Sequence, residues 1–269
     1  MARLRVSVVK YLNTAPLVWG MLHGAQRAQF ELSFTVPAQC AEALRHGAVD
    51  AGIIPAIEYQ TIPNLKVIPG IAIAARERVA SVLLVSRVPV AEVRQVALDA
   101  SSRTGATLVK ILFAKLWQQQ PSYGTQELNL EAMLAAADAA LLIGDPALQF
   151  LLGSPERRGK LFVYDLAEEW QRLTGQPFVF AFWAVRAEKA PEAVVEAFVA
   201  SKDYGLSRIE EIAAEAAWQL ALPAAALARY LRENVVFSFA AEERQGLESF
   251  YRYAHELGLI AAVRPLEFV

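Results

Sequence analysis

The chain has 269 residues, 55% of them hydrophobic, and its formal net charge at pH 7 is −2. Its longest apolar runs are only as long as a strand, whereas a membrane-spanning helix needs roughly 20 apolar residues, and no cluster of Lys and Arg marks a nucleic-acid-binding face. These properties exclude DNA, RNA and the membrane as primary partners and predict a globular protein with a sizeable core.

The first third of the chain alternates short apolar runs with helical patterns. The intervals between successive runs are too long for hairpins, except between the last two runs. This βαβ spacing predicts an α/β fold with a mostly parallel sheet. We expect strands at 4–9, 31–36, 50–54, 66–74 and 81–86, a helix at 37–46 and a short helix at 56–59.

The middle third repeats this rhythm, and the tail from residue 191 to residue 260 is almost wholly helical in pattern. The tail pattern is interrupted at 222–223 and again at 237–238. In the middle third we expect strands at 94–98, 139–143, 161–164 and 178–185, and helices at 104–117, 146–152 and 167–173.

Two βα sets followed by a helical tail indicate two α/β lobes rather than one wide sheet. Two strands could carry the chain between the lobes, residues 81–87 outward and residues 178–186 on the return. Lobe one then comprises residues 1–86 and 184–269, and lobe two residues 87–183. A cleft between such lobes, lined by the carboxyl ends of strands, is where small ligands bind.

The segment YLNTAPLVWG, residues 11–20, predicts a turn from the first strand into a helix, with Asn13 in the turn. Thr14 can cap this helix, and Pro16 suits its first turn, where a missing N–H costs nothing. Because the free amides and the helix dipole point the same way, such a turn can bind an anion. An ordinary strand-to-helix connection is the alternative. Lys10 is the one lysine beside the turn.

A second anion-binding turn is predicted at DASSRTGATL, residues 99–108. Ser102 or Thr104 caps the helix that follows, and Gly105 lets an anion approach the backbone closely. The alternative is plain capping, with Arg103 in a surface ion pair.

A third strand-to-helix turn is LIGDPAL, residues 142–148. Asp145 before Pro146 fits an N-cap followed by a first-turn proline, which is the role we favour. An acid–base role is the alternative, because Asp145 would lie at the carboxyl end of a strand. Glu58 could also face the cleft, and Trp183 could form a wall against a planar ring.

Common catalytic and metal-binding motifs are missing. There is no GxSxG, no Ser-His-Asp spacing and no nucleotide-binding glycine motif, and His23, His46 and His255 are too far apart for a zinc motif. The single cysteine, Cys40, allows no internal disulfide, and residues 1–20 do not read as a signal peptide, so we expect a cytoplasmic protein. An enzyme with this sequence must rely on easy chemistry or on help from its substrate.

Six segments in order, YLNTAPL, DAGIIPAIEY, SSRTG, DAALLIGDPAL, DLAEEW and TGQPFVFAFWAVR, resemble the menaquinone biosynthesis proteins of the MqnA type, the chorismate dehydratases of the futalosine route. The resemblance runs from residue 4 to about residue 186 and leaves the tail with little motif. It implies a two-lobed fold like that of the type II periplasmic binding proteins. The related 1,4-dihydroxy-6-naphthoate synthases share the fold but usually begin with a Ser-Pro-Cys-Pro-Asn segment, which is absent here.

The resemblance further implies that chorismate loses water to give 3-[(1-carboxyvinyl)oxy]benzoate, with no cofactor and no metal. Chorismate carries two carboxylates, and the sequence offers two helix starts for them. Asn13 is then the catalytic residue, with its amide orienting the departing hydroxyl and the enolpyruvyl carboxylate. In this interpretation that substrate carboxylate acts as the base.

The residues expected to bind substrate lie around the same turns. One departure concerns Gly105, where the family usually has serine, so one hydroxyl donor is missing while the backbone N–H remains. Tyr11, Leu12 and Ser81 would face the reacting end, Ser101, Thr104, Gly105 and Ala106 would hold one carboxylate, and Asp145 is a further candidate.

Three other functions fit a fold of this kind. One is a non-catalytic protein that binds a small carboxylate, and another is the naphthoate synthase of the same route. The third is the ligand-sensing domain of a transcription regulator, which would follow a helix-turn-helix of roughly 60 residues, whereas this sequence begins with a strand.

Overall fold

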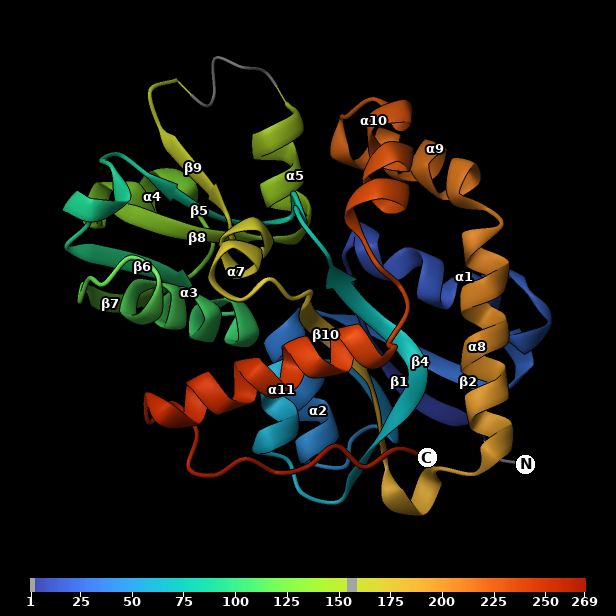
Figure 1. The fold of residues 1–269 in the computed structure, drawn as a ribbon. Helices are drawn as coiled ribbons and strands as arrows, with labels where there is room; N and C mark the ends of the chain where they lie inside the picture. Colours follow the sequence, from blue (N-terminus) through green and yellow to red (C-terminus); the bar gives the residue numbers. More distant parts are fainter. Residues whose placement is uncertain (1–2, 154–158) are drawn as a thin grey trace.

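The computed structural model describes residues 3–153 and 159–269 and contains two five-stranded sheets (Figure 1). The first sheet has, in spatial order, β2 (Phe30–Thr35), β1 (Leu4–Val9), β3 (Ala51–Pro55), β10 (Phe178–Arg186) and β4 (Leu65–Ala75). The second has β7 (Ser122–Gln126), β6 (Gln95–Asp99), β8 (Ala139–Ile143), β5 (Val82–Ser86) and β9 (Phe162–Asp165). Strands β3, β5 and β8 are buried along their whole length, as their continuous apolar sequences require.

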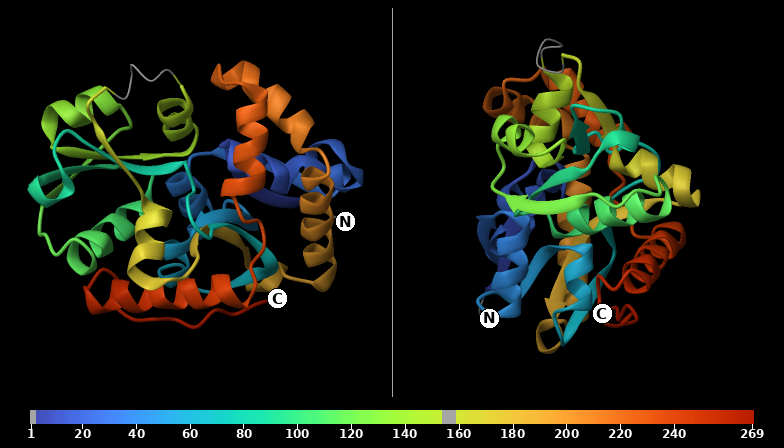
Figure 2. Two further views of the ribbon diagram at one scale, coloured as in Figure 1. Left: turned by 45° about the horizontal axis from the view of Figure 1, so that its top comes forward. Right: turned by 90° about the vertical axis from the view of Figure 1, so that its left-hand side faces the viewer.

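Helices pack on both sheets (Figure 2). The first sheet carries α1 (Ala15–His23), α2 (Pro37–Arg45) and α8 (Glu192–Leu206), and the second carries α3 (Arg103–Lys115), α4 (Leu130–Ala136), α5 (Gly144–Leu152) and α7 (Leu166–Thr174). Short 3-10 helices occur at η1 (Leu12–Thr14), η2 (Ala25–Ala28), η3 (Ala56–Gln60), η4 (Val90–Glu92) and η5 (Ala187–Lys189).

The expectation of mostly parallel sheets is wrong. β1 is parallel to β2 and β3, and β6 is parallel to β7 and β8. β10, however, is antiparallel to β3 and β4, and β5 is antiparallel to β8 and β9. β5 and β10 each directly follow a change of sheet. Each strand therefore enters its sheet from the opposite lobe and runs antiparallel to its neighbours there. For the same reason β4 and β5, the pair whose spacing allowed a hairpin, lie in different sheets.

The chain changes sheet ahead of the two strands that we expected to carry the crossings. β5 belongs to the second sheet and β10 to the first, so the crossings are at residues 76–81 and 175–177. Residues 82–86 and 178–183 therefore lie in the other sheet from the one that the expected lobe boundaries assign. We keep the residue bounds of the two lobes as a proposal, with these two crossing segments between them.

Helix α1, which follows the first turn, is fixed by close packing on α8. Ser201 in α8 accepts a hydrogen bond from the Met21 N–H at 3.0 Å and donates one to the Leu17 carbonyl at 2.9 Å. A Cβ at Gly205 would lie only 2.0 Å from the Pro16 carbonyl oxygen, so glycine is needed for this approach. The first turn thus rests on a rigid helix pair.

The tail is helical, with breaks where the sequence predicts them. It forms α9 (Ile209–Leu220), α10 (Ala224–Arg229), the π-helix η6 (Tyr230–Asn234) and α11 (Ala241–Glu256). Helix α11 packs on β10 of the first sheet and contacts α3 of the second lobe, where Lys115 Nζ lies 2.6 Å from the Glu256 carboxylate (Figure 1). The tail therefore joins the two halves of the molecule.

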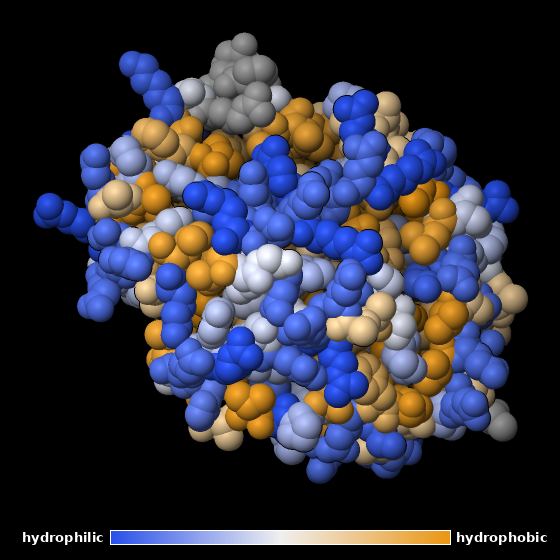
Figure 3. All heavy atoms as spheres, viewed as in Figure 1, coloured by the Kyte–Doolittle hydropathy of each residue, from blue (hydrophilic) through white to orange (hydrophobic). Residues whose placement is uncertain are grey.

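On the face shown in Figure 3, hydrophilic residues cover most of the surface and apolar residues form small separate groups. Within residues 3–153 and 159–269, none of the helices is both long enough and apolar enough to cross a bilayer.

Candidate active site

The first predicted turn is the 3-10 helix η1, which joins β1 to α1. The Leu12 N–H donates to the Asp145 carboxylate at 2.8 Å, whereas the Asn13 N–H has no acceptor among the residues that the structure describes. Thr14 occupies the N-cap position of α1 but does not cap it, and its hydroxyl donates to Asn13 Oδ1 at 3.4 Å. The capping prediction for Thr14 is wrong, and the turn keeps one free amide beside the Asn13 side chain.

Helix α3 begins directly after Ser102, as the second predicted turn requires. Ser102 occupies the N-cap position without making a capping hydrogen bond, and the Thr104 hydroxyl instead accepts the Ile57 N–H at 3.2 Å. Neither predicted cap forms. The N–H groups of Arg103, Thr104 and Gly105 meet no acceptor in the described parts of the chain, so three amides are free at the positive end of a 13-residue helix.

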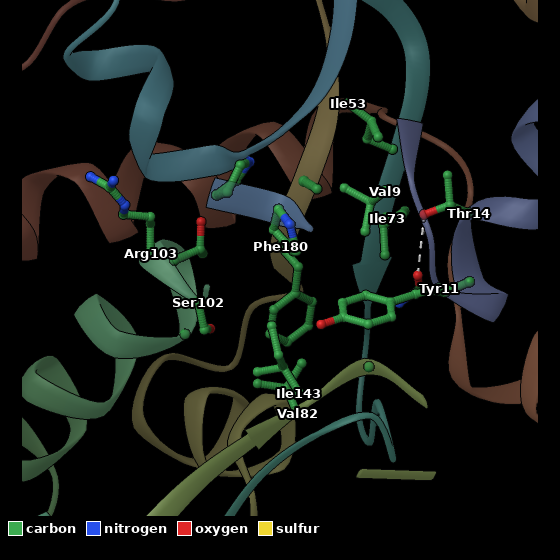
Figure 4. Close-up of a pocket in the computed structure, with 17 residues that line it drawn as sticks. Val9, Tyr11, Thr14, Ile53, Ile73, Val82, Ser102, Arg103, Ile143 and Phe180 are labelled. Carbon is green, nitrogen blue, oxygen red and sulfur yellow. Dashed lines mark hydrogen bonds between the residues drawn. The ribbon is translucent and has the colours of Figure 1, made fainter. Parts of the chain in front are cut away.

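Both helix starts face one cavity of about 70 Å³ (Figure 4). The ends of β1, β3 and β8 reach the same space, as expected where the carboxyl ends of strands meet a cleft. The polar lining comes from Tyr11, Asn13, Thr14, Ser102, Arg103 and Thr104, and the apolar lining includes Val9, Ile53, Ile73, Val82, Ile143 and Phe180.

The structure brings four of the nine predicted site residues to this cavity. They are Tyr11, Asn13, Thr104 and Gly105. Asn13 follows β1 of the first sheet and Thr104 follows β6 of the second, and the two residues are 91 positions apart in the chain, so only the fold brings them together.

Three predicted residues, Ser81, Ser101 and Ala106, do not line the cavity. Ser81 is fully buried, and its hydroxyl accepts a hydrogen bond from Tyr230 at 2.9 Å. Ser101 donates its N–H and its hydroxyl to Asp99, at 2.8 Å and 2.9 Å. The Ala106 N–H is used inside the helix, where it donates to the Ser102 carbonyl at 3.2 Å.

Leu12 and Asp145 lie on the other side of the first turn, where they line a second cavity of about 320 Å³ together with Lys10 and Trp19. Asp145 is in the first turn of α5, and the N-cap position belongs to Ile143, so the predicted capping role is wrong. The Asp145 carboxylate instead connects the second lobe to the first turn.

Tyr11 reaches from the first lobe to the second. Gly144 has a φ of +65°, and a Cβ there would lie 2.7 Å from the Tyr11 ring, so the ring packs on bare backbone. Burial, with the negative charge of Asp99 nearby, raises the pKa of Tyr11 to about 12, against a lowering by hydrogen bonding with Ser101. The phenol therefore stays protonated at neutral pH.

Asp99 is a residue that the sequence did not single out. It is 3% exposed, and its Oδ2 atom has no hydrogen-bond partner in the described structure. Burial raises the pKa of Asp99, against the lowering by its bonds from Ser101. Its position, at the end of β6 and directly before a predicted anion-binding turn, was the available signal.

The missing side chain at position 105 is partly replaced by Ser102. A Cβ on Gly105 would lie 2.4 Å from Ser102 Oγ, so a serine at position 105 would require Ser102 to turn away. The Ser102 hydroxyl makes no hydrogen bond of its own within the described residues and lines the cavity. One hydroxyl therefore remains at this helix start.

Ion pairs also cross the site. Arg103 lies 3.2 Å from the Glu58 carboxylate and 3.3 Å from the Glu42 carboxylate, both in the first lobe. Glu58 is 3% exposed and pairs with Arg45 as well, at 2.5 Å. Glu58 is therefore held by two guanidinium groups rather than free in the cleft. Trp183 is fully buried and does not line the cavity, whose aromatic lining comes from Tyr11 and Phe180 instead.

Asp145→Asn is expected to flatten the pH dependence of folding stability between about pH 4 and pH 6. Burial raises the pKa of Asp145 to about 6, against the lowering by the Leu12 N–H. The Asp145 carboxyl thus binds its proton more tightly in the native protein than in the unfolded chain. The contribution of Asp145 to the free energy of unfolding therefore decreases as pH rises and becomes constant above about pH 6. Urea denaturation at pH 4.5 and pH 7 tests this, and equal changes in both proteins would refute it.

Among the described residues, no group of three or more His, Cys, Asp or Glu side chains is arranged to hold a metal ion. The site offers amides, hydroxyls, one carboxamide and the Arg103 guanidinium around a small apolar space. Such a set can hold carboxylates and orient a leaving group.

A family model described as menaquinone biosynthesis matches residues 4–256. The chain belongs to this family. A curated relative of this chain comes from Thermus thermophilus and is named chorismate dehydratase. It is 32% identical over 263 residues, which cover 93% of each chain.

Comparison with solved structures places this chain among proteins with the periplasmic-binding-protein fold. Protein AF1704 from Archaeoglobus fulgidus has a TM-score of 0.75 at 16% identity, covering 96% of this chain and 98% of that one. The periplasmic aliphatic sulphonate binding protein SsuA from Escherichia coli has a TM-score of 0.64 at 21% identity, covering 97% and 94%. The predicted two-lobed α/β fold is confirmed.

Proposed function

We propose that this chain is a cytoplasmic chorismate dehydratase, which removes water from chorismate to give 3-[(1-carboxyvinyl)oxy]benzoate. The observation that carries the proposal is the pair of helix starts on one cavity, with three free amides at α3 and one at Asn13. Chorismate has two carboxylates, and free amides at helix starts bind such groups. The relative from Thermus thermophilus with the name chorismate dehydratase supports the same substrate.

The reaction makes modest demands on the protein. The ring proton beside the enolpyruvyl ether is acidic because its loss is conjugated with the ring carboxylate. Departure of the neighbouring hydroxyl then makes the ring aromatic, and the proton and the hydroxide leave together as water. No electrons are gained or lost overall, so this hydro-lyase step needs no redox cofactor.

Each side of the cavity has a part in this proposal. The amides of Arg103, Thr104 and Gly105 hold one carboxylate of the dianion. The Asn13 carboxamide orients the departing hydroxyl and the enolpyruvyl carboxylate, and that carboxylate takes the ring proton. Holding the reacting groups in this arrangement and excluding water is the protein's contribution.

The cavity of about 70 Å³ is smaller than the roughly 300 Å³ or more of typical ligand pockets. In this proposal the structure is a closed form, and the lobes separate to admit chorismate. The contacts that must break include the Leu12–Asp145 and Ile57–Thr104 hydrogen bonds and the ion pairs of Arg103 with Glu42 and Glu58.

Purified protein incubated with chorismate tests the proposal. We expect a new aromatic ultraviolet band and a product 18 mass units lighter than chorismate, the mass of one water. Chorismate binding without that band would indicate a carboxylate-binding protein of the same fold. If the protein does not convert chorismate but acts on the substrate of the naphthoate synthase, the proposal is wrong and the chain is a naphthoate synthase.

A further inference from the structure

Tyr230 is a buried tyrosine that no sequence motif marks. It is the first residue of the π-helix η6 in the tail, it is 2% exposed, and it lies 217 positions after Asn13. Its hydroxyl donates to Ser81 Oγ at 2.9 Å, and hydrogen bonding by the Asn13 side chain acts to lower its pKa. The tail therefore supplies a polar group to the back of the first turn.

The two neighbours of Asn13 act on opposite ends of its carboxamide. The Thr14 hydroxyl donates to Asn13 Oδ1 at 3.4 Å, so that end is the acceptor. The Tyr230 hydroxyl already donates its one hydrogen to Ser81, so toward Asn13 it can only accept, which requires the Nδ2 end. Together the contacts select one of the two amide orientations.

Tyr230 keeps this arrangement at every working pH. Burial raises its pKa far above the ordinary value for tyrosine, so the hydroxyl remains neutral. Its anchor is also fixed: the Ser81 carbonyl accepts the Gly144 N–H at 2.7 Å, and Ser81 is the last residue of the first crossing segment.

The π-helix gives a local reason for this placement. A π-helix holds an extra residue in its turn and is frequent at functional sites. At its other end, Asn234 donates to the Arg78 carbonyl at 3.1 Å, so η6 is tied to the same crossing segment at both ends. The tail is thus held in a fixed position relative to the first turn.

We propose that Tyr230 is a positioning residue that sets the orientation of the Asn13 carboxamide through a Ser81–Tyr230–Asn13 hydrogen-bond network. This inference rests on the proposed function, because the turnover of chorismate is its readout. Tyr230 does not itself line the cavity, so it acts only through Asn13, which does.

Tyr230→Phe and Tyr251→Phe form a matched pair for the test. Tyr251 in α11 is 1% exposed, and its hydroxyl donates to the Ala56 carbonyl at 2.7 Å, so its loss also removes one buried hydrogen bond. We expect Tyr230→Phe to lower kcat about 10- to 100-fold with KM within about threefold, because small misplacements of reacting groups cost this much. Tyr251→Phe should lose similar thermal stability and keep its kcat.

A double-mutant cycle separates positioning from general damage. Assayed at high enzyme concentration, Tyr230→Phe should change the residual kcat of Asn13→Ala less than about twofold, because its target is gone. An equal loss in both backgrounds, or equal kcat for the two tyrosine variants, overturns the inference. If Tyr230→Phe does not fold, Ser81→Ala is tested in its place and is also expected to lower kcat. An unchanged kcat in Ser81→Ala would then contradict the inference. A wild-type protein that leaves chorismate intact rejects the proposed function, and the role of Tyr230 with it.

Discussion

Asn13→Ala is expected to lower kcat for chorismate at least about 100-fold, the usual cost of losing one oriented hydrogen-bonding group at a reacting centre. Substrate affinity should change no more than about tenfold, or about 1.4 kcal/mol. The reason is that the three free amides of α3 still hold one carboxylate, whereas the departing hydroxyl loses its partner. Steady-state kinetics together with calorimetric binding of the product separates the two effects.

Asn129→Ala provides a matched control for this experiment. Asn129 caps α4 by accepting the Ala132 N–H at 3.0 Å, far from the cavity lining. Its replacement should cost about 1 kcal/mol of stability and leave kcat unchanged. Near-normal turnover by Asn13→Ala would remove Asn13 from the mechanism.

The strand and helix pattern of this chain is largely readable from its sequence, because long apolar runs and amphipathic helices follow simple periodicities. Among the strands and α-helices that the structure describes, β7 and α4 were not predicted. β7 is the polar edge strand SYGTQ, with two residues half-buried and the others exposed, so it lacks the apolar alternation of a strand. Helix α4 is seven residues long, which is too short for a clear period.

Strand direction and the lobe boundaries were less predictable. The sequences of β5 and β10 are uniformly apolar, which indicates burial but not which sheet a strand enters or in which direction. Both depend on where the crossing segments turn. One of these, residues 76–81, is held by the Asp165 carboxylate, which accepts the N–H groups of Val79 and Ala80. Such contacts between distant residues leave no local pattern.

The candidate site shows the same division. The two helix starts were predicted because anion-binding turns have a local composition, and the fold places Asn13 and Thr104 at one cavity. The roles of Asp145 and Tyr230 were not predicted, because each depends on partners more than 130 positions away. The partner of Asp145 is Leu12, and the partners of Tyr230 are Ser81 and Asn13. The capping predictions failed for a related reason: the site keeps its amides free where an ordinary helix would satisfy them.

Ser102→Asp is expected to raise KM for chorismate at least about 100-fold, or about 2.7 kcal/mol. Ser102 occupies the N-cap position of α3, lines the cavity and makes no capping hydrogen bond. An aspartate there would accept the free N–H groups of Thr104 and Gly105, and its charge would exclude the substrate carboxylate from the positive helix end. Because an N-cap aspartate stabilises a helix, thermal stability should be kept or increased while binding is lost. Ser102→Asn is the control, since it has nearly the same shape and caps without a negative charge. KM values that agree within about threefold for the two variants would show that α3 does not hold a substrate carboxylate.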